Sequence, residues 1–121
     1  MPEDNNKRQT RRRNLFYYLE VVDAKTQTVI GRMIDISHGG FLCSGKAMLV
    51  PSRRYDLRIN TPENVIQDDF ILLEAECVRI SHAPQDIGSF DFAFEVTHLS
   101  DSEKEKLEDL IFKLDMKTKI M

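Results

Sequence analysis

The segment at residues 90–96, FDFAFEV, restricts the possible folds of this chain most strongly, because its side chains alternate in character from one residue to the next. Its apolar positions are Phe90, Phe92, Phe94 and Val96, and the intervening positions are Asp91, Ala93 and Glu95. An alternation of period two is typical of a strand with one buried face. The sequence therefore predicts an antiparallel sheet whose second face is exposed to solvent.

Five other segments have strand character and predict further strands, most clearly the one that begins at Leu15, which is rich in aromatic and β-branched residues. They cover residues 15–23, 28–36, 41–44, 54–60 and 70–80. Turn-forming residues separate them, notably the SHGG cluster at residues 37–40. The alternation in 70–80 is imperfect, which predicts a β-bulge or a barrel corner there.

A helix is predicted after the last strand. Ser100 is an N-cap candidate, and Glu103 follows at the third helical position, as in a capping box. Apolar residues then recur at helical spacing and form one stripe, namely Leu107, Leu110, Ile111 and Leu114. We expect this stripe to pack on the sheet or across the mouth of a barrel.

Six short strands and one helix in 121 residues indicate a single domain. The predicted fold is all-β with a C-terminal helix, a six-stranded antiparallel β-barrel that removes sheet edges by closure. The predicted divisions are a flexible basic N-terminal arm at 1–14, the barrel at 15–98, the helix at 99–115 and a tail at 116–121. No apolar run is long enough to insert in a membrane, and the first 14 residues lack a signal-peptide core, so we expect a cytoplasmic protein.

The net charge of −3 hides a strong asymmetry. Five cations lie within seven residues, Lys7, Arg8, Arg11, Arg12 and Arg13, so the rest of the chain carries −8. Such a basic run is commonly a solvated tail or a general contact for polyanions. The acidic remainder disfavours a broad nucleic-acid surface.

Enzymatic and metal-binding functions find little support in the sequence. Nucleophile elbows, P-loops, dinucleotide-binding turns and zinc-protease helices are all missing from it, so we do not expect an enzyme. The histidines share no ligand spacing with one another or with the cysteines, so no metal and no cofactor are expected. Cys43 and Cys77 lie in apolar strand segments and are interpreted as buried, inert thiols.

Two short patterns remain. Arg8 and Arg12 form R-x-x-x-R, and Asp35, Ser37 and Gly40 form D-x-S-x-x-G. Each pattern is weak alone, because basic tails often contain the first, and the second is an ordinary turn in which Asp and Ser bond to the local backbone.

Together, with the arginines just before the first strand and the second motif at the end of the next strand, these patterns resemble the PilZ family. The resemblance extends through RNLFYYLEV and the terminal helix after THLSDSE, about residues 8–114. It implies a six-stranded barrel that binds cyclic di-GMP across its outer face where the arm folds over. On this mapping the ligand-binding residues are Arg8, Arg12, Asp35, Ser37 and Gly40, with Arg11, Arg13 and Gly39 as accessory contacts.

The chemistry of these residues suits such a ligand. An arginine fork binds phosphate or the O6/N7 edge of guanine through two hydrogen bonds. Asp35 can accept hydrogen bonds from guanine N1–H and the exocyclic amine, which adenine cannot offer together. Gly40 is expected to admit the ligand closely and to adopt a positive φ.

Three alternatives remain open. In the first, the motif at residues 35–40 is only a self-capped turn and the arm binds no ligand. In the second, the chain is a PilZ-like interaction domain that has lost ligand binding. In the third, it is a small barrel that binds nucleic acid. In the favoured interpretation, ligand orders the arm and changes contacts with an unidentified protein partner in motility or biofilm regulation. Alternation also places one of Tyr17 and Tyr18 inward and the other outward.

Overall fold

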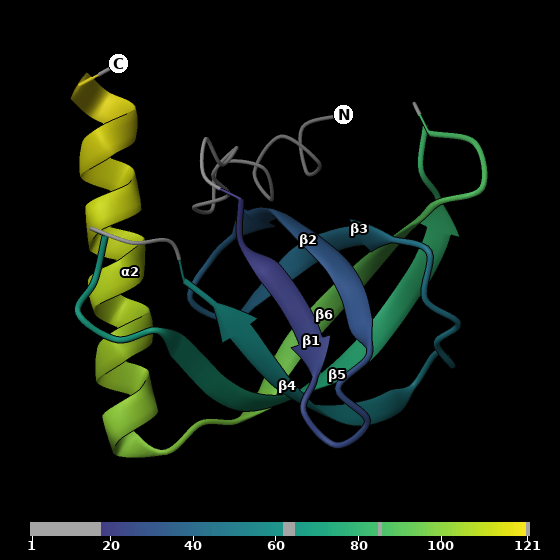
Figure 1. Ribbon diagram of the computed structural model, residues 1–121, viewed down its shortest axis with the longest axis horizontal. Helices are drawn as coiled ribbons and strands as arrows, with labels where there is room; N and C mark the ends of the chain where they lie inside the picture. Colours follow the sequence, from purple (N-terminus) through teal and green to yellow (C-terminus); the bar gives the residue numbers. More distant parts are fainter. Residues whose placement is uncertain (1–17, 62–64, 85, 121) are drawn as a thin grey trace, which may run out of the picture.

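The computed structural model describes residues 18–61, 65–84 and 86–120 of the protein. In this described part the elements follow one another as strands and then a helix (Figure 1). The strands are β1 (Glu20–Asp23), β2 (Val29–Ile36), β3 (Gly40–Gly45), β4 (Arg53–Asn60), β5 (Phe70–His82) and β6 (Phe90–His98), and the helix is α2 (Asp101–Ile120).

The strands form a closed antiparallel barrel in the order β1-β2-β3-β6-β5-β4. The barrel closes through β1, which pairs with β2 on one side and with β4 on the other. β3 pairs with β6 rather than with β4, the next strand in the sequence. The predicted all-β class, with six antiparallel strands in a barrel and a C-terminal helix, is confirmed.

The strand boundaries agree closely with the predicted segments. β5 runs two residues beyond its predicted end, to His82, and its register with β6 shifts twice, as expected for a bulged strand. β1 begins only at Glu20, and residues 15–17 of the segment predicted for it lie outside the described residues. Leu19, just before β1, still accepts a backbone hydrogen bond from Met33 N–H at 2.8 Å.

The alternating face of β6 fills the barrel as the sequence predicts. Phe92 and Phe94 are buried, and Phe90 and Val96 pack partly buried against the same core. Phe94 stacks on Phe41 of β3 with ring centroids 5.1 Å apart. The core therefore lies within the barrel, and the outward positions of β2, β3 and β6 remain available for other roles.

The start of α2 is anchored to β5 by side chains. Ser100 caps the helix, its Oγ accepting from Glu103 N–H at 3.4 Å. The Glu103 carboxylate accepts the backbone N–H of Leu72 at 2.8 Å, whereas the capping-box pattern predicts a return to Ser100. Lys106 pairs with Glu103 at 3.1 Å and donates to the Phe70 carbonyl at 3.3 Å. The pairing of β6 with β5 reaches only Glu74, so the helix supplies hydrogen-bond partners for this earlier stretch of β5.

The four residues of the predicted helical stripe are all buried, and α2 packs beside the barrel against β5 (Figure 1). The helix continues to Ile120, whereas the sequence predicted its end at 115 and a tail from 116. No glycine or proline follows Ser100 to stop it. Within the described residues, no helix combines the length and the apolar character that a membrane span requires.

Both cysteines are free thiols in the core. Burial, aided by the negative charge of Asp91, raises the pKa of Cys43 to about 12, and burial also raises the pKa of Cys77. We therefore expect both thiols to resist a disulfide reagent such as DTNB at pH 8 in the folded protein and to react after denaturation. Rapid labelling of the native protein would contradict this prediction.

The raised pKa of Cys43 also predicts how stability depends on pH. The unfolded thiol ionises near its ordinary pKa of 9.0, whereas the folded thiol retains its proton up to about 12. The contribution of Cys43 to stability is therefore complete below pH 9 and is lost between pH 9 and 12. Urea denaturation of the wild type and of Cys43→Ala across that range measures the difference.

Candidate functional site

The predicted site residues fall into two groups. Arg8, Arg11, Arg12 and Arg13 lie outside the described residues. Asp35, Ser37, Gly39 and Gly40 all lie at the end of β2, in the turn that follows or at the start of β3. The structure therefore brings the second motif together in one short connection.

A β-bulge determines the direction of Asp35. Arg32 pairs with Ser44 and Asp35 pairs with Leu42, so β2 contains one more residue than β3 in this stretch, and the extra residue is Ile34. Paired residues of neighbouring strands point to the same face of a sheet. Arg32 and Asp35, three positions apart, therefore share the outer face of the barrel instead of opposing each other.

Ser37 is engaged in the turn itself. Its backbone N–H donates to the Gly40 carbonyl at 2.9 Å, and its hydroxyl donates to the same oxygen at 3.2 Å. Both bonds hold the β2–β3 connection closed. This geometry matches the self-capped turn that the sequence left open as an alternative for Ser37.

Glycine is needed at position 40 for a structural reason different from the one that the sequence suggested. Among the described residues the positive φ angles belong to Gln27, Ser52 and Gly88, so the positive φ predicted for Gly40 is wrong. A Cβ at Gly40 would instead collide with the backbone carbonyl of Phe94 on β6. Glycine is thus required here for the close approach of β3 and β6.

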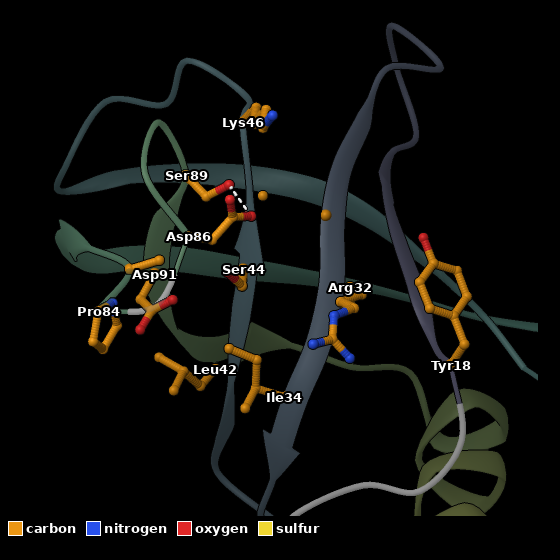
Figure 2. A pocket seen from close by; sticks show the side chains of 13 residues that line it. Tyr18, Arg32, Ile34, Leu42, Ser44, Lys46, Pro84, Asp86, Ser89 and Asp91 are labelled. Carbon is orange, nitrogen blue, oxygen red and sulfur yellow. Dashed lines mark hydrogen bonds between the residues drawn. The ribbon is translucent and has the colours of Figure 1, made fainter.

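A groove opens on the outer face of the barrel beside this motif (Figure 2). Its cavity volume is about 530 Å³. Arg32 and Tyr18, a residue that is 61% exposed, form one side. The opposite side comes from the β5–β6 loop and from Asp91 of β6, and Leu42 and Ser44 of β3 lie between the two sides.

The groove combines charged side chains of both signs with apolar residues such as Ile34 and Leu42. Arg32 and Lys46 are its cations, and Asp86 and Asp91 are its carboxylates. Asp86 accepts a hydrogen bond from the Ser89 hydroxyl at 2.7 Å. Such a surface can hold a planar heterocycle against its apolar residues while the charged groups bind a phosphate and ring N–H donors.

Asp35 borders this groove, because its neighbour Ile34 and its cross-strand partner Leu42 both line it. Asp35 is itself only 9% exposed. The motif residues Asp35, Ser37 and Gly40 are not among the lining residues. The predicted motif and the groove are thus adjacent parts of one outer surface.

Sequence reasoning did not single out the groove residues Arg32, Ser44, Lys46 and Asp91. Asp91 was correctly expected on the exposed face of its strand. The missing information was strand pairing, because Ser44 and Asp91 become neighbours only when β3 pairs with β6.

Comparisons with known proteins agree with this architecture. The family model described as PilZ domain matches residues 6–113. No curated protein gives a significant match to the sequence. The PilZ domain of YcgR from Escherichia coli, solved with c-di-GMP, superposes with a TM-score of 0.63 at 18% identity, covering 84% of this chain and 83% of that one.

Two further solved structures share the fold over most of this chain. MrkH from K. pneumonia in its apo state gives a TM-score of 0.72 at 13% identity, over 89% of this chain and 51% of its own. The Bacillus subtilis inhibitor of motility, MotI/DgrA, gives 0.67 at 18% identity, over 93% and 51%. The chain thus spans about half the length of these two proteins. Because the family model extends over nearly the whole chain and includes both motifs, the chain belongs to the PilZ domain family.

Proposed function

We propose that this PilZ domain is a receptor for cyclic di-GMP and not an enzyme. The observation that carries the proposal is the bulge at Ile34, which turns Asp35 to the outer face next to a groove containing Arg32. The similar PilZ domain of E. coli YcgR was solved with c-di-GMP, which supports the choice of ligand. Cyclic di-GMP is then a regulatory ligand, and the chemistry described requires no cofactor.

The ligand contacts follow from the chemistry of the motif residues. Arg8 and Arg12 bind phosphate or the guanine O6/N7 edge, and Arg11 and Arg13 assist. Asp35 accepts from guanine N1–H and the exocyclic amine. Ser37 and Gly40 act chiefly by fixing the turn that presents Asp35, since their contacts lie within the barrel.

The signal passes through the arm at residues 1–14. Four arginines near one another repel when no anion is bound, so the dianionic ligand orders the arm against the barrel. The changed surface then gains or loses a protein partner in the cytoplasm, in motility or biofilm regulation. The similar B. subtilis protein is an inhibitor of motility, which supports that range of processes.

A second candidate is a PilZ interaction domain that does not bind ligand. The bonds of Ser37 within its own turn and the packing role of Gly40 favour it, because both residues have a structural reason for their identity. A nucleic-acid-binding role is disfavoured by the net charge of −8 outside the basic run at residues 7–13.

Calorimetric titration with cyclic di-GMP tests the proposal. We expect saturable binding to the wild type, no competition by linear GMP, and a ~10- to 100-fold weaker Kd for Arg12→Ala and for Asp35→Asn, because each change removes charge-assisted hydrogen bonds. Hydrogen exchange of the arm should slow only in the presence of ligand.

Arg54→Ala is the matched control for Arg12→Ala, since Arg54 is exposed on β4 and does not line the outer groove. Its Kd should equal that of the wild type. If the folded wild-type protein produces no heat and no thermal stabilisation at high ligand concentration, the receptor proposal is wrong and the interaction domain replaces it.

A further inference from the structure

Four polar side chains form a cross-strand row on the outer face of the barrel. Arg32 of β2 pairs with Ser44 of β3, Ser44 pairs with Asp91 of β6, and Asp91 pairs with Ser81 of β5. Arg32 and Asp91 are therefore two strands apart, roughly 10 Å at the spacing of neighbouring strands. A cation and a carboxylate stand on opposite sides of one small hydroxyl residue.

The two charges of this row are open to a ligand. Among the described residues, no ion pair or side-chain hydrogen bond engages Arg32, Lys46 or Asp91. Figure 2 shows Arg32 on the Tyr18 side of the groove and Asp91 on the Pro84 side. The groove thus has a cationic side and an acidic side that do not neutralise each other.

The surroundings of Asp91 suit a purine. Leu42 and Pro84 line the groove with Asp91 and supply apolar surface for a flat ring. A carboxylate beside such a surface can accept hydrogen bonds from guanine N1–H and its 2-amino group together. Adenine would instead direct its unprotonated N1 at the negative charge, which is repulsive. A carboxylate in such surroundings therefore suits guanine better than adenine.

The surroundings of Arg32 suit a phosphate. A guanidinium binds phosphate oxygens through two parallel hydrogen bonds, and Lys46 adds a second positive charge to the same groove. Asp35 lies on the same outer face of β2 as Arg32, three residues later in the strand and beyond the bulge. A ligand with one guanine at Asp35 can thus place a phosphate at Arg32.

We propose that Asp91 and Arg32 recognise the second half of a bis-guanine cyclic dinucleotide, with Asp91 reading the second guanine and Arg32 holding a phosphate between the two bases. This inference rests on the proposed receptor function and assigns specificity to residues outside both motifs. Asp35 and Asp91 then each read one base, so two guanines are required for full affinity.

The test compares cyclic di-GMP with 3′,3′-cyclic GMP–AMP, which differs only in one base. The single guanine of the hybrid occupies Asp35 and leaves adenine at Asp91. We expect the wild type to prefer cyclic di-GMP by ~10- to 100-fold, as for a site whose polar groups lose their partners. Asp91→Ala should bring the ratio of the two Kd values to about 1–3, and Arg32→Ala should weaken both ligands while leaving the ratio near the wild-type value.

Glu108→Ala is the matched control, because it removes one carboxylate from the exposed side of α2 without touching the groove. It should keep the wild-type ratio. If cyclic di-GMP binds and Asp91→Ala retains the wild-type ratio, Asp91 does not read a base and this inference is overturned, while the receptor proposal stands. Failure of the wild type to bind cyclic di-GMP overturns the receptor proposal itself and the inference that rests on it. Thermal melts of each variant verify that the barrel is folded.

Discussion

Replacing Gly40 by alanine is expected to lower the free energy of unfolding by about 3 kcal/mol, at the upper end of the usual cost of overpacking. The added Cβ would collide with the Phe94 carbonyl, which belongs to the rigid backbone of β6 and not to a movable side chain. β3 and β6 must therefore separate locally, and their ladder hydrogen bonds weaken. Urea denaturation of the wild type and the variant measures the loss.

Gly39→Ala is the matched control, one residue earlier in the same turn. No heavy atom lies within 4 Å of a Cβ built on Gly39. Its replacement should change stability by less than ~1 kcal/mol, with a gain expected from the reduced entropy of the unfolded chain. Equal losses for the two variants would show that the turn, and not the β3–β6 contact, requires glycine.

Leu110→Ala is expected to cost about 2–5 kcal/mol, the range for truncating a large buried aliphatic side chain. Leu110 is fully buried on the face of α2 that packs against the barrel. The substitution leaves a cavity between helix and barrel, while the helix propensity of alanine slightly favours the helix. Thermal and urea unfolding, followed by circular dichroism, measure the loss.

Phe112→Ala on the same helix is the control, because Phe112 is 61% exposed. We expect its free energy of unfolding to lie within ~0.5 kcal/mol of the wild type, as for surface changes in general. A loss at Phe112 as large as that at Leu110 would mean that the outer side of α2 is also covered, for instance by a second copy of the chain.

The sequence predicts most of the local structure, because short-range periodicity is a local property. The alternation around Phe92 identifies a half-buried strand, and the stripe around Leu110 identifies the packed face of a helix. The helix end was placed too early, at 115, since helical propensity continues without a breaker. Local patterns carry no information on which strands pair across the barrel.

The candidate site is harder to predict from the sequence, because its residues are brought together by strand pairing. The bulge at Ile34 decides that Arg32 and Asp35 share a face, and the pairing of β3 with β6 places Asp91 beside Ser44. Neither follows from composition or spacing. The role of Gly40 was misassigned in the same way, because the Phe94 carbonyl that excludes a Cβ is far away in the sequence.

The order of strands also determines when this protein can fold during its synthesis. β1 with β2 and β4 with β5 are sequence neighbours that can associate early, but β3 finds its second partner only in β6, which is the last barrel strand in sequence order. Loop closure over such a separation slows folding. A nascent chain that ends before β6 therefore exposes the unpaired backbone of both β3 and β5, and we expect such truncated chains to need chaperone protection until the final strand leaves the ribosome.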